Sequence, residues 1–167
     1  MEIARLSIRP MAASDKNAFV QGIQDISFRL AYGFPPDMDD TVPPQIFDRF
    51  CKLNRAYVLV RKEKNQMIGF LLDVDPELPA DRITDLPGKG RTLAYAVFPP
   101  YQRQGYMQEA LQAYIPSLFQ NDGISFIHCG HFPENTPSSN LLAKLGFREY
   151  TEHMTGNKVI IDEILRK

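Results

Sequence analysis

Cysteine is scarce in this sequence, and its scarcity excludes several classes of protein. The 167 residues include two cysteines, Cys51 and Cys129, which lie far apart and form no C-x-x-C pair. A disulfide framework is therefore excluded, and without a charged-then-apolar signal segment at the N-terminus we expect a reducing, cytoplasmic setting. Neither thiol has a neighbour that would activate it, which disfavours covalent catalysis through cysteine.

Long apolar runs and an excess of one charge are also missing. No run approaches the roughly 18 apolar residues of a membrane span, because even Ala56–Val60 stops at Arg61 and Lys62. The chain has 19 Lys and Arg against 20 Asp and Glu, a net charge of −1. We therefore expect a soluble protein without a nucleic-acid or membrane partner.

Histidine is equally sparse, and the three histidines do not have zinc spacing. His128, Cys129 and His131 are close in sequence, and we interpret them as strand-end packing, so no metal is predicted. The length predicts one domain over residues 1–167. Composition leaves the oligomeric state open between monomer and homodimer.

Hydrophobic periodicity and turn residues predict a mixed α/β chain in the order β-α-α-β-β-β-α-β-α-β-β. Ser14 and Asp15 are suited to cap the first helix. Pro116 is expected to kink or end early the helix that begins at Tyr106. The strands are predicted at residues 4–9, 57–61, 66–74, 91–98, 125–129, 147–154 and 157–165. Helices are predicted from Asp15 to about Ser27, from Pro44 to about Leu53, in the run from Tyr106 to Phe119, and within residues 135–147. Irregular loops are predicted at 34–44 and 76–90.

Two segments carry the functional signal. The first follows the strand Leu93–Phe98 and runs from Gln102 to Met107 into a helix. Backbone N–H groups at a helix start have no intrahelical partner and bind anions, and Gly105 permits a close approach. By itself this pattern is equally typical of a plain strand-to-helix turn. The second segment, Asn135–Phe147, reads as a helix with a polar start and a glycine stop.

Together the motifs P-x-Y-x-x-x-G-Y-x-x-E-A-L, ending at Leu111, and N-x-x-S-x-x-L-L-x-K-L-G-F, from Asn135, resemble the GNAT family of acyl-CoA-dependent N-acetyltransferases. Within it the chain is most similar to the RimJ/RimL branch, which acetylates protein N-terminal and other amines. The resemblance is tightest over residues 92–150, and Arg5–Pro10 matches the usual opening strand. It implies a mostly antiparallel sheet of six to seven strands with about four helices, and acetyl-CoA and an amine acceptor as partners.

The resemblance also implies a cofactor site. The pyrophosphate of acetyl-CoA is expected on the loop, and the pantetheine arm is expected to pair with the backbone of the preceding strand like an added strand. Asn135 and Ser138 take the positions of polar contacts to the arm and thioester, although both also suit a plain helix start. The implied cofactor residues are Ala96, Val97, Phe98, Gln102, Arg103, Gln104, Gly105, Tyr106, Met107, Asn135 and Ser138.

The catalytic groups depart from the family pattern. Leu142 stands where many relatives carry a proton-donating tyrosine, so Ser138 is the candidate proton donor. No glutamate occurs on the strand Leu93–Phe98, so His131 is the candidate general base. Met107 replaces a small residue, and Glu109 is interpreted as favouring the helix dipole.

The leading prediction is thus direct acetyl transfer from acetyl-CoA to a primary amine, either a protein N-terminus or a small-molecule amine. The alternative is a non-catalytic acyl-CoA-binding module of the same fold, since the expected acid and base are missing. A nucleotide-binding domain of another fold is disfavoured, because the loop has neither G-x-G-x-x-G nor G-x-x-x-x-G-K-[ST].

Overall fold

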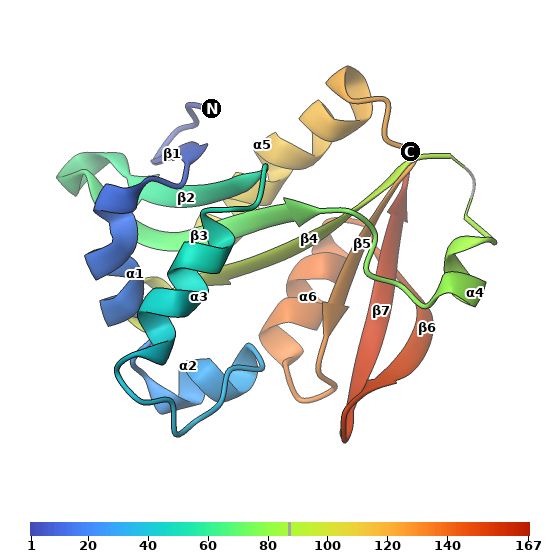
Figure 1. Ribbon diagram of the computed structural model, residues 1–167. Coiled ribbons are helices and arrows are strands. Elements are labelled where there is room, and N and C mark those ends of the chain that lie inside the picture. The colour runs from blue at the N-terminus through green and yellow to red at the C-terminus, as the bar shows by residue number, and fades with distance from the viewer. Residues whose placement is uncertain (87) are drawn as a thin grey trace. The chain divides into compact units, whose positions relative to one another are not determined.

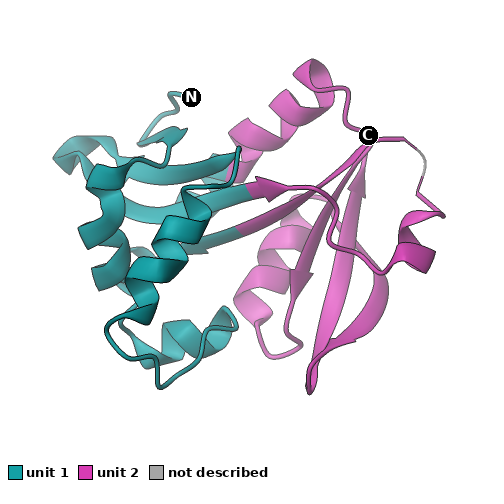
Figure 2. Cartoon of the chain, viewed as in Figure 1, with its two compact units in different colours: residues 1–72, 95–110 teal, residues 73–94, 111–167 magenta. Residues whose placement is uncertain are grey.

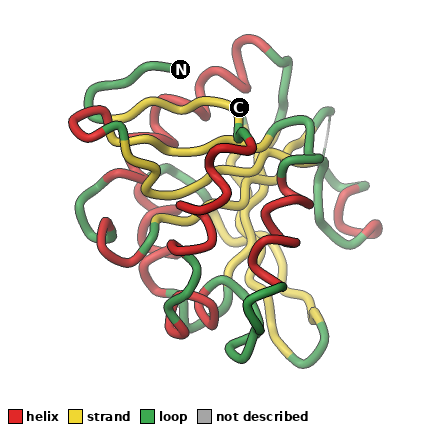
Figure 3. Tube along the Cα trace, turned by 60° about the vertical axis from the view of Figure 1, so that its left-hand side comes forward, coloured by secondary structure: helices red, strands yellow, loops and turns green. Residues whose placement is uncertain are grey.

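The computed structural model describes residues 1–86 and 88–167, so Pro87, inside the predicted loop at 76–90, lies outside the described residues. Helices and strands alternate along much of the chain (Figures 1 and 3). The seven strands of the described part are β1 Leu6–Pro10, β2 Ala56–Arg61, β3 Gln66–Val74, β4 Gly90–Val97, β5 Phe126–His131, β6 Arg148–Thr155 and β7 Lys158–Arg166. The six α-helices there are α1 Lys16–Gly22, α2 Ile26–Ala31, α3 Val42–Phe50, α4 Ala80–Ile83, α5 Tyr106–Asn121 and α6 Thr136–Lys144.

The strands form one sheet in the order β1-β2-β3-β4-β5-β7-β6. The pairs β1–β2, β2–β3, β5–β7 and β6–β7 are antiparallel, whereas β4 and β5 are parallel. The ladder between β4 and β5 is short and joins Gly90–Thr92 to Phe126–His128. This mostly antiparallel mixed sheet confirms the predicted fold class.

The chain divides into two compact units, shown in different colours in Figure 2. The first contains residues 1–72 and 95–110, and the second contains residues 73–94 and 111–167. The strands β3 and β4 and the helix α5 each contribute residues to both units.

The first unit is built on aromatic side chains between its helices and its strands. Phe19 of α1, Phe47 of α3 and Phe70 of β3 are buried in one hydrophobic cluster. The ring centroids of Phe19 and Phe47 lie 5.5 Å apart, and those of Phe19 and Phe70 lie 5.6 Å apart. Such tilted aromatic pairs bury a large apolar area and add about 0.5–1.5 kcal/mol each, so they hold α1 against α3 and β3.

In the second unit, α6 packs against β5, and the hairpin of β6 and β7 extends the sheet. A smaller hydrophobic cluster contains Phe126 of β5, Ile164 of β7, and Leu78 and Leu86 from the connection before β4. The short helix α4 lies in that connection, where the sequence predicted only a loop.

Two helix predictions were wrong in detail. The first helix ends at Gly22, where a Cβ would lie 2.5 Å from the Phe98 ring, and a second helix begins because Asp25 accepts a hydrogen bond from the Phe28 N–H. Pro116 does not end α5 early, because the helix continues to Asn121 with Leu118 fully buried. Tertiary packing therefore outweighs the cost of proline. None of the described helices is long and apolar enough to span a bilayer.

Candidate functional site

The loop between β4 and α5 has an unusual backbone. After β4 the chain makes a 3-10 turn at Pro99–Tyr101 and reaches α5 at Tyr106. Gly105 has φ +78°, and Arg103 has φ +60°, a left-handed conformation that non-glycine residues rarely adopt. Such strain persists only where the surroundings maintain it and is concentrated at ligand sites.

The same loop presents a row of backbone donors. Among the residues that the structure describes, none accepts a hydrogen bond from the backbone N–H groups of Arg103, Gln104, Gly105, Tyr106 or Met107. Residues 102–105 are exposed, whereas Tyr106 and Met107 are buried. Exposed N–H groups at the positive end of a 16-residue helix make a site for an anion.

Arg5 braces this loop from the start of the chain. Its Nε lies 2.6 Å from Glu109 Oε2, and its backbone N–H donates to Glu109 Oε1 at 2.7 Å. Its Nη1 donates to the Gln104 carbonyl at 3.0 Å, and the guanidinium lies 4.5 Å from the Tyr106 ring centroid. The contacts of Glu109 are therefore with Arg5, and sequence reasoning did not identify Arg5 because the partners are about a hundred residues apart.

The end of β4 has two different edges. The Phe98 N–H donates to the Ile68 carbonyl of β3 at 2.8 Å, and the Ala96 carbonyl lies so close to Gly69 that a Cβ there would be 2.2 Å away. Val97 faces the other way. Its N–H donates to the Tyr32 hydroxyl, and its carbonyl accepts from Gln102 Nε2 at 2.9 Å. Among Ala96, Val97 and Phe98, only Val97 has both its N–H and its carbonyl bonded to groups outside β3.

Phe98 lies in the core of the first unit. Its side chain is 2% exposed, and its ring centroid lies 6.0 Å from that of Phe28 and 6.5 Å from that of Phe70. Sequence reasoning also missed Tyr32, which follows α2 and whose ring centroid is 4.5 Å from that of Phe28. Burial raises the pKa of the Tyr32 phenol, and the hydrogen bond from the Val97 N–H partly opposes this effect.

Asn135 and Ser138 form the start of α6. Asn135 is the N-cap, and its side chain accepts from the Ser138 N–H at 3.3 Å. Both side chains are half-buried. The structure therefore gives Asn135 the capping role that its residue type favours, and this role is compatible with a further contact to a ligand.

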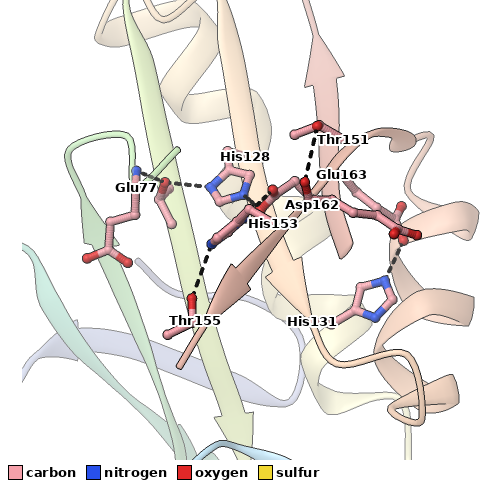
Figure 4. Close-up of polar contacts among 10 residues, drawn as sticks. Glu77, His128, His131, Thr151, His153, Thr155, Asp162 and Glu163 are labelled. Atoms are coloured by element: carbon pink, nitrogen blue, oxygen red, sulfur yellow. Dashed lines mark hydrogen bonds and ion pairs between the residues drawn. The ribbon is translucent and has the colours of Figure 1, made fainter. Parts of the chain in front are cut away.

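His131 is buried and has a partner at each ring nitrogen, and Figure 4 shows its contact with Glu163. Nδ1 lies 2.9 Å from the Phe132 carbonyl oxygen, and Nε2 lies 2.9 Å from Glu163 Oε1. Because a carbonyl only accepts, Nδ1 carries a proton and donates it, and Nε2 is engaged by the carboxyl group. Both ring nitrogens are therefore engaged within the protein, and the role of His131 as the general base stays a prediction.

Another set of hydrogen-bonded polar side chains connects β4, β5, β7 and β6 (Figure 4). Thr92 Oγ1 lies 2.8 Å from His128 Nδ1, and His128 Nε2 lies 2.8 Å from Asp162 Oδ1. The other Asp162 oxygen lies 2.6 Å from His153 Nδ1. The buried Asp162 carboxylate thus satisfies the buried imidazole of His128 and the half-buried imidazole of His153. Among the described residues, no three His, Cys, Asp or Glu side chains are placed to hold a metal ion.

The sequence identifies the family to which these elements belong. Residues 5–148 match the family model described as an acetyltransferase (GNAT) domain. The match covers most of the 167 residues, so the chain belongs to the GNAT acetyltransferase family, whose general chemistry is acetyl transfer. No curated protein matches the sequence at a significant level.

Solved structures share the fold. A GNAT-family acetyltransferase from Bacillus anthracis superposes with a TM-score of 0.80 at 17% identity, covering 99% of this chain and 96% of that one. The ribosomal-protein-S5-alanine acetyltransferase of Vibrio fischeri gives 0.69 at 20% identity, covering 99% and 95%. Spermidine N-acetyltransferase from Vibrio cholerae, in complex with CoA and spermine, gives 0.73 at 13% identity, covering 97% and 95%.

Proposed function

We propose that the protein is an acetyl-CoA-dependent N-acetyltransferase of the RimJ/RimL type, which transfers acetyl directly to a primary amine in the cytoplasm. The observation that carries the proposal is the loop at 103–107 of a GNAT chain, with its row of N–H groups that have no acceptor among the described residues. Relatives of the same fold include enzymes named for a ribosomal protein and for spermidine, so both protein and small-molecule amines are candidate acceptors. The two free thiols agree with a reducing compartment.

The residues of the loop fit a diphosphate. The N–H groups of Gln104 to Met107 would donate to its oxygens, and Arg103 would add positive charge from an exposed position. Bound acetyl-CoA would supply the activated thioester. The outward edge of Val97 would supply one N–H and one carbonyl to the amides of the pantetheine arm.

For the chemical step we propose Ser138 as the proton donor to the leaving thiolate. The amine lone pair would attack the thioester carbon, the C–S bond would break, and the leaving sulfur would take the serine proton. The nitrogen, positively charged after the attack, would lose one proton, which returns to the serine through solvent, so that a neutral amide and a free thiol result. A thiolate leaves easily, so a weak acid suffices. We assign His131 a positioning role, because its bonds to Phe132 and Glu163 hold the turn that precedes Asn135.

Isothermal titration with acetyl-CoA tests the cofactor site. Gly105→Glu adds a negative side chain at φ +78° in the predicted diphosphate loop, and we expect micromolar binding by the wild type to weaken by on the order of tenfold or more. Gly156→Glu is the matched control. It adds the same charge at φ +60° in a turn where a Cβ meets nothing within 4 Å, so affinity should be unchanged.

An amine panel completes the test. Wild-type protein should acetylate peptides with free N-termini or polyamines, as measured by release of free CoA thiol. Binding of acetyl-CoA without turnover of any amine would favour the non-catalytic acyl-CoA-binding module. No binding by the wild type would contradict both readings.

A further inference from the structure

The outward edge of Val97 is occupied by the protein itself. Its N–H donates to the Tyr32 hydroxyl, and its carbonyl accepts from Gln102 Nε2 at 2.9 Å. Both partners are side chains, whereas the opposite edge of β4 is satisfied by backbone, as the Phe98 bond to Ile68 shows. Tyr32 comes from the end of α2, and Gln102 comes from the loop before α5.

A strand edge with one N–H and one carbonyl on the same residue pairs with any extended chain that carries amides. Val97 is 6% exposed, so its polar groups need partners when such a chain is absent. The Tyr32 hydroxyl and the Gln102 amide meet this need. A ligand that adds to the edge has to exchange both bonds for its own.

We propose that Tyr32 is a displaceable plug: its hydroxyl holds the Val97 N–H in the free protein and leaves when the amide-bearing arm of the cofactor binds. The inference rests on the proposed function and adds a residue that neither the family motifs nor the predicted site contains. Tyr32 thereby sets the affinity for the arm, because every binding event breaks the bond between Tyr32 and Val97.

The end of α2 is held in place by bonds that do not involve the Tyr32 hydroxyl. The Tyr32 N–H donates to the Phe28 carbonyl at 3.1 Å, which closes the end of α2. Arg29 anchors the same segment, since its Nε donates to the Ile23 carbonyl at 2.8 Å and its Nη1 donates to the Pro36 carbonyl at 3.1 Å. Loss of the bond between Tyr32 and Val97 therefore leaves these anchors of α2 in place.

The test is isothermal titration of Tyr32→Phe with CoA and with adenosine 3′,5′-bisphosphate, which lacks the arm. Phenylalanine keeps the ring on Phe28 but leaves the Val97 N–H without its acceptor in the free protein. We expect the dissociation constant for CoA to fall by about three- to tenfold, and that for adenosine 3′,5′-bisphosphate to stay the same. A variant that is only misfolded or destabilised would not bind CoA more tightly than the wild type while its affinity for adenosine 3′,5′-bisphosphate stayed the same.

Tyr150→Phe is the matched control, because it also removes a tyrosine hydroxyl. Tyr150 lies on β6, and its hydroxyl donates to the Arg82 carbonyl at 2.8 Å. Its affinity for CoA should equal that of the wild type. If Tyr32→Phe binds CoA with unchanged or lower affinity, or if both ligands shift equally, the plug is wrong while the proposed function stands. Wild-type protein that does not bind CoA would contradict the proposed function and the plug together.

Discussion

At the scale of single residues, Arg9 of β1 illustrates how one ion pair organises a local turn. Arg9 Nη1 and Nη2 lie 2.8 and 2.7 Å from the two oxygens of Asp15, which also accepts the Ala12 N–H at 2.9 Å. Burial by itself would raise the pKa of Asp15, but the guanidinium and the N–H together lower it below its ordinary value. The pair therefore joins β1 to the entry of α1.

Asp15→Asn should lower the free energy of unfolding by about 1 kcal/mol at pH 7, a modest value because Arg9 remains 41% exposed. A carboxyl group whose pKa is depressed by folding stabilises above its unfolded pKa of about 3.9. That contribution disappears as the pH falls through the lower folded pKa, so wild type and variant should converge in acid, below the folded pKa. Urea denaturation at pH 7 and in acid measures the difference.

Asp48→Asn provides the comparison, because Asp48 forms an exposed ion pair with Lys16 at 2.8 Å. Its effect at pH 7 should be below about 0.5 kcal/mol. Equal losses for the two variants, or a loss at Asp15 that persists in acid, would show that the Arg9–Asp15 pair does not have this role.

At the scale of elements, α6 depends on its first residue. Asn135 caps the helix through the Ser138 N–H, and Pro137 lies in the first turn, where its missing N–H costs nothing. The glycine stop is also as predicted, because Gly146 has φ +91° just after the helix. Local chemistry therefore sets both ends of α6.

Asn135→Ala should lower the free energy of unfolding by about 1 kcal/mol, and Asn135→Asp should restore it, because aspartate also accepts from the N–H of the first turn. Thermal unfolding followed by circular dichroism measures both. Titration with CoA separates the two readings of this residue. If Asn135 only caps the helix, Asn135→Asp binds like the wild type, whereas a loss of affinity at full stability indicates direct contact with the cofactor.

At the scale of the whole molecule, three elements are shared between the two compact units. Since β3, β4 and α5 each run from one unit into the other, neither unit has a complete set of elements without them. We propose on this ground that the chain unfolds as one domain, as its length suggests.

The two thiols report on this proposal, because Cys51 is in the first unit and Cys129 is in the second. Cys51 is exposed, whereas burial raises the pKa of the 2% exposed Cys129 thiol. A thiol reagent should modify one cysteine per native chain and two in urea, and modification of Cys129 should coincide with the loss of helical signal. Labelling of Cys129 well before that loss would mean that the second unit opens by itself.

Most elements followed from the sequence because their causes are local. The strand Gln66–Val74 was predicted with its observed bounds, since alternation acts over a few positions. The terminal hairpin was also predicted, but its turn lies one residue later than expected, at Gly156 and Asn157, because Thr155 still pairs with Lys158. The break between α1 and α2 and the length of α5 were not predicted. They depend on the ring of Phe98, just after β4, against Gly22 and on the burial of Leu118, and hydrophobic periodicity contains neither.

The candidate site divides in the same way. The sequence alone determined the loop at Gln102–Met107, the cap at Asn135 and the family, because glycine, polar caps and motif spacing are written along the chain. Only the tertiary structure decided that Arg5 braces Gln104, that Tyr32 bonds to Val97, and that His131 is engaged by Glu163. The partners in these contacts lie 32 to 99 residues apart. Contacts over such distances arise only when the folded sheet and helices bring their elements together.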